Sequence, residues 1–145
     1  MSKLKGKNVL VTGGGSGIGE AISLLFAQEC AKIHIVDLNK EQGGAVVKRI
    51  VENGGNAELH ICSVSHQADV KQLVSQIEKI DILVNNAGIA HVGNVENCAE
   101  RDFTNLFDVN VRGVYNMIYA AIPTMKWWRR YSKSSVYSGF GGYTR

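Results

Sequence analysis

A glycine-rich segment at residues 12–19 constrains the fold of this chain more than any other feature. Its sequence is TGGGSGIG, and it follows a short apolar segment, NVLV at residues 8–11, that is typical of a buried strand. Residues 17–30 then repeat apolar side chains at the spacing of a helix. These apolar residues are Ile18, Ile22, Leu25 and Phe26. The glycines therefore predict a sharp turn from a strand into a helix, where free backbone N–H groups can hold a phosphate.

The glycine spacing in this turn is T-G-x-x-x-G-x-G. It differs from G-x-G-x-x-G, and it is not a P-loop because no Lys followed by Ser or Thr closes it. We expect Gly13, Ser16, Gly17, Ile18 and Gly19 to contact the phosphates of a bound dinucleotide. A glycine-rich turn without a ligand is the alternative.

Asp37 ends the next apolar segment, residues 33–36, about twenty residues after the glycines. Dinucleotide-binding folds place an acidic residue there, where it hydrogen-bonds a ribose 2′-hydroxyl. A carboxylate would repel the 2′-phosphate of NADP, and Ser16 is not a basic residue that could pair with that phosphate. NAD is therefore predicted as the cofactor, with NADP less favoured. The alternative is that Asp37 is the N-cap of a helix beginning near Asn39.

Length and composition favour one domain spanning residues 1–145, because 145 residues with 45% hydrophobic content can bury one core. No apolar stretch approaches the twenty or so residues of a membrane span, and the N-terminus lacks the apolar region of a secretion signal. We therefore expect a cytoplasmic protein without membrane contact.

The cysteines Cys30, Cys62 and Cys98 show neither a metal pattern nor a disulfide framework. They are interpreted as reduced packing residues, and no metal is predicted. Without Arg129, Arg130 and Lys133, the remaining 13 basic residues would balance the 13 acidic ones. No nucleic-acid partner is therefore predicted, although the basic segment at 126–133 leaves that function as a weak alternative.

Strand-like and helix-like segments continue to alternate after Asp37. They are a helix at 40–52, a strand at 57–62, a helix at 67–78 capped by Ser65, and a strand at 81–84. With right-handed crossovers, this alternation predicts an α/β fold with a doubly wound parallel sheet. Ligands of such sheets bind beyond the carboxyl ends of the strands.

The sequence NNAG at residues 85–88 follows the last of these strands. Amides can bond neighbouring strand ends, and alanine and glycine leave room for a flat ring or a ribose; a simple turn is the alternative. The residues predicted to contact the cofactor beyond the glycine turn and Asp37 are Ser63, Val64, Asn86, Ala87 and Gly88.

A long helix is predicted over residues 100–125. Its expected core-facing residues are Phe103, Leu106, Phe107, Val111 and Val114. Asn110 and Gly113 are poor helix formers in the middle of this helix. Such local exceptions are typical of functional positions, and a kink without a role is the alternative.

Together these motifs resemble the short-chain dehydrogenase/reductase family. The matching residues are T-G-x-x-x-G-x-G at 12–19, Asp37, NNAG at 85–88 and N-x-x-G at 110–113. The resemblance covers residues 5–125 and implies a Rossmann fold, incomplete at its C-terminal end. It also implies an oxidoreductase that transfers a hydride between a nicotinamide cofactor and a small alcohol or ketone. Relatives are commonly dimers or tetramers, so a homo-oligomer is possible.

The resemblance also implies an active site of Asn, Ser, Tyr and Lys. Asn110 matches the Asn that holds a proton-relay water, and Ser135 matches the Ser that binds the substrate oxygen, with Ser138 as an alternative. The lysine lowers the pKa of the tyrosine, which allows the tyrosine to exchange a proton with the substrate. The chain contains no Tyr-x-x-x-Lys. It is therefore expected to be the N-terminal portion of a longer enzyme, the alternative being a non-catalytic dinucleotide-binding remnant.

One residue and one segment depart from the family pattern. Ser63 stands where the family often has an aspartate beside the adenine. Residues 126–133, KWWRRYSK, stand where the family has a glycine-rich turn and an apolar fifth strand. A local frameshift is our hypothesis for this aberrant segment, because one choice of codons read one base later encodes Gly-Gly-Gly-Val-Ile-Leu.

Overall fold

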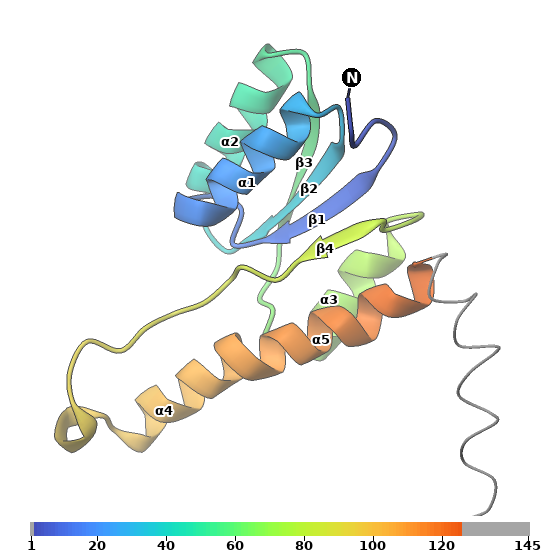
Figure 1. Cartoon of the computed structure of the whole chain (residues 1–145). Helices are drawn as coiled ribbons and strands as arrows, with labels where there is room; N and C mark the ends of the chain where they lie inside the picture. The colour runs from blue at the N-terminus through green and yellow to red at the C-terminus, as the bar shows by residue number, and fades with distance from the viewer. Residues whose placement is uncertain (1, 126–145) are drawn as a thin grey trace, which may run out of the picture.

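The computed structural model describes residues 2–125, which form a parallel four-stranded sheet with helices on both faces (Figure 1). The strands are β1 (Asn8–Thr12), β2 (Lys32–Asp37), β3 (Asn56–Ile61) and β4 (Ile82–Val84). The helices are α1 (Gly17–Gln28), α2 (Lys40–Glu52), α3 (Gln67–Ser75), α4 (Glu100–Phe107) and α5 (Gly113–Ala121). The strand order is β3-β2-β1-β4. The predicted doubly wound α/β fold is confirmed.

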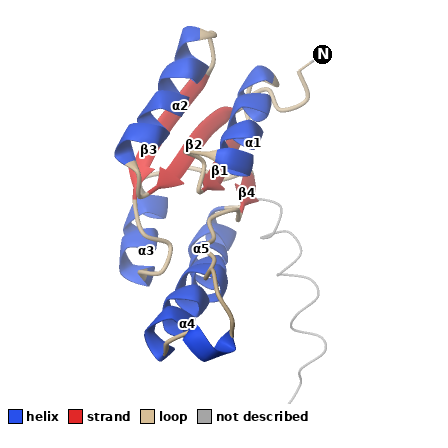
Figure 2. Ribbon diagram, turned by 90° about the vertical axis from the view of Figure 1, so that its left-hand side faces the viewer, coloured by secondary structure: helices blue, strands red, loops and turns tan. Residues whose placement is uncertain are grey.

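Two hydrophobic cores lie on opposite faces of the sheet, because side chains alternate along each strand. Val9 and Val11 of β1 pack with residues of α1 and α2. Leu10, between them, packs with residues of α3 and α5 on the other face. Figure 2 shows the same two layers from the side, with the sheet between them. Strand β1 is therefore buried on both faces, as its continuous apolar sequence predicts.

Asp81 connects the beginning of β4 to the beginning of β1. Its carboxylate accepts a hydrogen bond from the backbone N–H of Asn8 (3.0 Å), and its own N–H donates to the Asn8 carbonyl (2.9 Å). Lys79 Nζ lies 2.6 Å from the other carboxylate oxygen. Burial raises the pKa of Asp81, but the hydrogen bonds from Lys79 and Asn8 outweigh it and leave the pKa below its ordinary value.

The predicted helix at 100–125 is observed as several helical pieces. Between α4 and α5 lies one π-helical segment, η2 (Asp108–Arg112), and a short 3₁₀ helix, η3 (Ile122–Thr124), follows α5. Another 3₁₀ helix, η1 (Val95–Asn97), precedes α4. Asn110 is in η2 and Gly113 begins α5, so both exceptional residues lie where the helical pattern changes.

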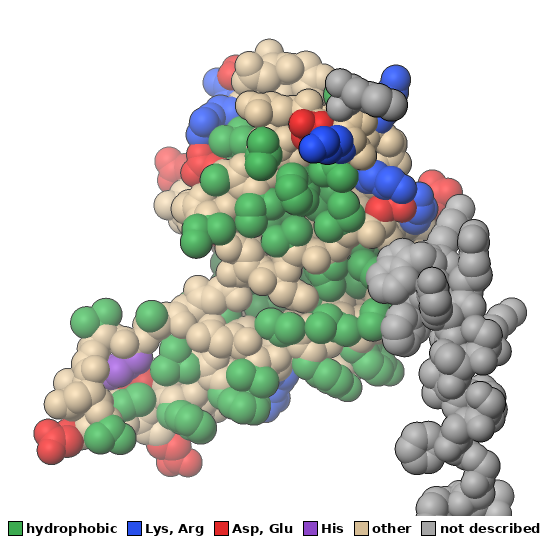
Figure 3. Space-filling model, in the orientation of Figure 1, with side chains coloured by type: hydrophobic (Ala, Val, Ile, Leu, Met, Phe, Trp, Pro, Cys, Tyr) green, Lys and Arg blue, Asp and Glu red, His purple; other side chains and the backbone are tan. Residues whose placement is uncertain are grey.

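The prediction of which residues of this region face the core is wrong. Phe103, Phe107 and Val111 are exposed, and Leu106 and Val114 are only partly buried. The buried side of α5 is formed instead by Gly113, Asn116, Met117 and Ala121. For the three residues of α4, the reason is that α4 extends beyond the sheet, so no strand of residues 2–125 lies under it (Figure 1). Hydrophobic side chains consequently gather on the surface along α4 and α5 (Figure 3).

Several smaller expectations also need correction. Ile18 and Leu25 are exposed, because α1 packs on the sheet through the smaller residues Gly19, Ser23 and Ala27. Cys30 is exposed rather than packed, whereas Cys62 is buried.

The third helix, α3, ends at Ser75 rather than at residue 78, and its N-cap is His66 instead of Ser65. None of the helices in residues 2–125 combines the length and the hydrophobicity that a membrane span requires. The aberrant segment at 126–133, where the family has its fifth strand, lies outside the described residues. The single domain over 1–145 stays a prediction.

Candidate cofactor-binding site

The carboxyl ends of the strands surround a cavity of about 290 Å³. This is the edge where parallel α/β sheets bind their ligands. The predicted cofactor residues that line it are Gly13, Ser16, Asp37, Ser63, Val64, Asn86, Ala87 and Gly88. Val36, Leu38, Cys62, Ile89 and Val109 complete its wall. The structure therefore brings together five sequence segments that are far apart in the chain.

The glycine turn is shaped by close backbone contacts. Gly13 has φ of 64°, and a Cβ there would lie 3.0 Å from the Ala87 Cα. A Cβ on Gly19 would overlap the carbonyl oxygen of Gly13. Gly13 requires glycine because of its positive φ and the close approach of the segment after β4, and Gly19 requires it because the first turn of α1 lies directly on the end of β1.

The start of α1 places beside the cavity backbone N–H groups that have no acceptor within the helix. Ser16 is the N-cap, and its side chain does not cap the helix. The N–H groups at the start of a helix have no partners within the helix and attract anions. Gly17, Ile18 and Gly19 do not line the cavity themselves but supply these N–H groups next to Ser16. Ile18 is 74% exposed, so its side chain does not obstruct this end of the helix.

Asp37 is held between the glycine turn and the start of α2. One carboxylate oxygen accepts from the Gly15 N–H (2.9 Å), and the other accepts from the Asn39 N–H (2.9 Å). Asn39 is the N-cap of α2, and its side chain accepts from the Gln42 N–H (3.0 Å). The alternative prediction that Asp37 is the N-cap is therefore wrong. Its carboxylate is fixed on the cavity wall.

Asn86 and Thr12 join the end of β1 to the segment after β4. The Asn86 side-chain amide donates to the carbonyls of Thr12 and Gly13, each at 3.1 Å. The buried Thr12 hydroxyl oxygen accepts from the N–H groups of Asn86 and Ala87, each at 3.0 Å. The expectation that an amide bonds a neighbouring strand end is confirmed for Asn86. The sequence alone assigned no role to Thr12, although a hydroxyl at the end of an apolar strand is a usable signal.

Asn110 contacts the same segment from the other side. Its side-chain oxygen accepts from the Ile89 N–H (2.9 Å), and its side-chain nitrogen donates to the Ile89 carbonyl (2.8 Å). Asn110 belongs to the π-helical segment η2, and such interruptions of α-helices are frequent at functional sites. The paired hydrogen bonds fix the position of Ile89, which lines the cavity.

Asn116 is a residue of this region that sequence reasoning missed. It is 1% exposed, and its side chain donates to the Val64 carbonyl (2.9 Å). It also accepts from the side chain of Gln67 (3.3 Å). These bonds attach the segment after β3 to α5. The signal in the sequence that could have identified Asn116 is an Asn among the apolar residues of a helix.

Two further residues belong to the wall next to this segment. The Ser63 hydroxyl lies 2.8 Å from that of Ser65, so the two serines share a hydrogen bond. Burial, together with the negative charge of Asp69, raises the pKa of the Cys62 thiol. Cys62 therefore stays protonated at neutral pH and acts as an apolar wall residue.

Ser135, the predicted catalytic serine, lies outside the described residues.

The sequence of this chain matches a known protein family. The family model described as short chain dehydrogenase matches residues 7–136. The chain belongs to the short-chain dehydrogenase family. An uncharacterized oxidoreductase of Thermotoga maritima is 41% identical over 124 residues, which are 84% of this chain and 49% of that protein. The chain therefore spans about half the length of this curated relative of the family.

Solved structures of the family share the fold. A putative short-chain dehydrogenase/reductase from Burkholderia xenovorans matches with a TM-score of 0.82 and 29% identity, covering 88% of this chain and 54% of that one. A metagenomic short-chain oxidoreductase in complex with NADP matches with a TM-score of 0.79 and 30% identity, covering 83% and 56%. The family's Rossmann fold binds nicotinamide cofactors, and members act as oxidoreductases on small molecules.

Proposed function

We propose that the cavity binds NAD in preference to NADP. We also propose that the chain is the cofactor-binding part of an enzyme that interconverts an alcohol and a ketone. The observation that carries the cofactor proposal is the Asp37 carboxylate, held by Gly15 and Asn39 on the cavity wall at the end of β2. A fixed negative charge there favours a free ribose diol and disfavours a 2′-phosphate.

Each part of the site fits one part of the cofactor. Asp37 would accept hydrogen bonds from the adenosine ribose. The N–H groups at the start of α1 would hold the pyrophosphate. Ala87 and Gly88 would leave room for the second ribose, with Asn86 holding the end of β1 in place. The Ser63 hydroxyl is bonded to Ser65, so we expect Val64 to contribute more of the adenine contact.

When bound, the nicotinamide would accept or supply the hydride. The contribution of Asn110 would be one of positioning, because both ends of its side-chain amide are bonded to Ile89. Those bonds hold the segment after β4 as one side of the cavity. Ser135 as the residue that binds the substrate oxygen stays a prediction. Nothing in residues 2–125 favours the non-catalytic alternative.

We further propose that the apolar surface of α4 and α5 meets a second copy of the chain, as the family resemblance implies. Its exposed residues include Phe103, Phe107, Val111, Tyr115 and Tyr119. Light scattering of the purified protein tests this, and a monomer at all concentrations would contradict it. A cytoplasmic location stays a prediction.

The cofactor proposal is tested by titrating the purified protein with NADH and with NADPH while following nicotinamide fluorescence. We expect NADH to bind at least about tenfold more tightly, since a carboxylate and a phosphate would repel each other in the NADPH complex. Tighter binding of NADPH would make the NAD assignment wrong. If neither nucleotide bound, the proposal that the cavity is a dinucleotide-binding site would be wrong.

A further inference from the structure

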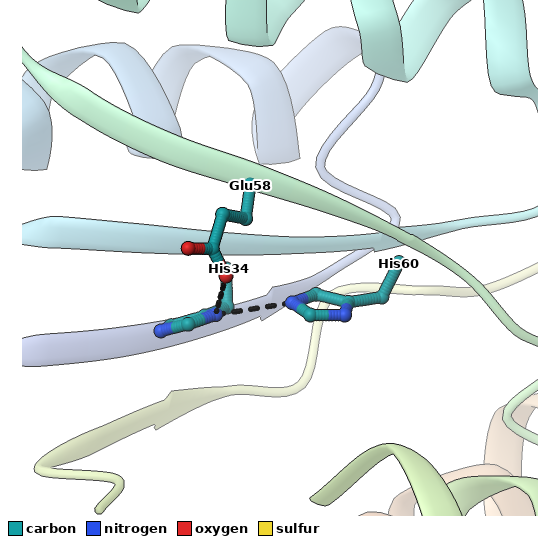
Figure 4. A group of neighbouring side chains, drawn as sticks. All are labelled: His34, Glu58 and His60. Atoms are coloured by element: carbon teal, nitrogen blue, oxygen red, sulfur yellow. Dashed lines mark hydrogen bonds and ion pairs between the residues drawn. The ribbon is translucent and has the colours of Figure 1, made fainter. Parts of the chain in front are cut away.

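A cluster of three side chains outside the cofactor cavity has the composition of a metal site. His34 lies on β2, and Glu58 and His60 lie on the neighbouring edge strand β3 (Figure 4). The register pairs His34 with Glu58 and Val36 with His60. Residues two apart on a strand, and residues directly opposite each other, share one face of a sheet. The three side chains therefore converge on the same face.

We propose that His34, Glu58 and His60 bind a zinc ion. Two imidazole nitrogens and one carboxylate oxygen are a ligand set that Zn²⁺ uses in proteins, with a fourth position open to water or another ligand. The proposal rests on this cluster alone and is independent of the proposed cofactor.

The distances between the ligand atoms are close to those that a zinc ion requires. His34 Nδ1 lies 3.0 Å from His60 Nε2 and 3.5 Å from Glu58 Oε2. All three ligand atoms lie within 4.8 Å of one another. Bonds of 2.0–2.2 Å in a tetrahedron place ligand atoms roughly 3.3 Å apart. Small side-chain rotations are therefore enough to bring the three atoms around one ion.

The protonation of the histidines favours binding. Burial, followed by the charges of His60 and Lys32, lowers the pKa of His34 to about 4. Burial likewise lowers the pKa of His60. Both imidazoles are therefore neutral at neutral pH, which is the form that coordinates a metal. The hydrogen bond between their facing nitrogens uses one proton, which would move to the other ring nitrogen of the same imidazole when zinc binds.

Lys32 is the competing cation at this site. Its Nζ lies 2.8 Å from Glu58 Oε1, whereas Oε2 is the oxygen that faces His34. One carboxylate oxygen therefore remains available to an ion, although the positive charge of Lys32 opposes a second cation nearby. This predicts that removing the Lys32 charge strengthens zinc binding.

The site is accessible from one side. His34 is 3% exposed, but His60 also lines a cavity of about 690 Å³ together with His66 and Asp69. An ion can reach His60 through this cavity, and coordination would then connect the edge strand to its neighbour. A bound ion would stabilise the native state, because the unfolded chain does not keep the three ligands together.

Calorimetric titration of untagged full-length chain with ZnCl₂ tests the proposal. We expect a single Zn²⁺ per chain, with affinity reduced at least about tenfold in Glu58→Gln and His60→Gln. His91→Gln, which alters a histidine outside the cluster, should bind like the wild type. Glu58 is half-exposed, so its variant should fold even if the His60 variant does not.

Lys32→Met provides a test in the opposite direction. Its affinity should rise by about tenfold, since the competing charge is gone. A separate titration with CoCl₂, followed by visible spectroscopy, should give the absorption of tetrahedral Co²⁺, which Glu58→Gln should lose. Wild-type affinity retained in both cluster variants, or the absence of zinc binding by the wild type and by Lys32→Met, would overturn the proposal.

Discussion

The backbone N–H of Gly15 donates a hydrogen bond to the carboxylate of Asp37 across 2.9 Å. This bond joins the glycine turn after β1 to the end of β2. It orients the carboxylate before any ligand arrives, so the charge that would select the cofactor is held by the same turn that would hold its phosphates. Preorganisation of this kind reduces the ordering cost of binding.

Replacing Asp37 with alanine should reduce selectivity for NADH over NADPH. The change removes two hydrogen-bond acceptors for a ribose and the charge that repels a 2′-phosphate. We expect NADH affinity to fall by about tenfold to a hundredfold and the preference over NADPH to shrink accordingly. Fluorescence titration with both nucleotides measures this. Asp69→Ala, which removes an exposed carboxylate on α3, is the matched control, and equal effects of the two substitutions would contradict the assignment.

Replacing Thr12 with valine should destabilise the protein although the two side chains have the same shape. The substitution leaves the N–H groups of Asn86 and Ala87 without their shared acceptor. We expect a loss of about 2–4 kcal/mol in the free energy of unfolding, measured by urea denaturation. Thr12→Ser keeps the hydroxyl and should lose much less. If the valine and serine variants were equally stable, these hydrogen bonds would have no net effect.

Two glycine-to-alanine substitutions in helices should act in opposite directions. A Cβ at Gly19 would overlap the Gly13 carbonyl oxygen, so Gly19→Ala must displace α1 from the turn and should cost about 3 kcal/mol. A Cβ at Gly44, within α2, has no neighbour within 4 Å. Gly44→Ala should therefore stabilise the protein by about 0.5–1 kcal/mol. Thermal denaturation of both variants gives the comparison, and a stabilised Gly19→Ala variant would disprove the close contact.

Asp81→Asn should destabilise the protein at neutral pH and have little effect in acid. Because the native pKa of Asp81 lies below its ordinary value of 3.8, the unfolded state binds a proton more readily. Its stabilising contribution is therefore complete above that ordinary value and disappears as the pH falls through the lower native pKa. We expect a loss of about 1–2 kcal/mol at pH 7 that shrinks as the pH falls through the lowered native pKa of Asp81. Urea denaturation from pH 2 to 7 should show the two stability curves converging, whereas parallel curves would exclude this role for Asp81.

The features that could be predicted from the sequence are those encoded locally. The glycine turn, Asp37 and the NNAG segment each follow a short apolar strand, so their place at one edge of the sheet follows from the alternation of strands and helices. Helix α2 also begins and ends at the predicted residues, because Asn39 caps it and glycines follow it.

The features that could not be predicted depend on contacts between distant segments. Helical spacing identifies an apolar side but not whether anything covers it, so the spacing predicts Phe103 and Phe107 in the core although both are exposed. His34 and His60 are separated by 26 residues and meet only through the pairing of β2 with β3. Asn116 was missed for the same reason, since its partner Val64 lies on a different element.

The pairing of β1 with β4 has a consequence for how the chain assembles during translation. Asn8 and Asp81, which join the starts of these strands, are 73 residues apart. At 5–20 residues per second, the ribosome needs roughly 4–15 s to make that length of chain. Strands β1, β2 and β3 can pair during this interval, while one edge of the apolar strand β1 still has no neighbour. That edge of β1 therefore stays open to pairing with other chains until β4 emerges.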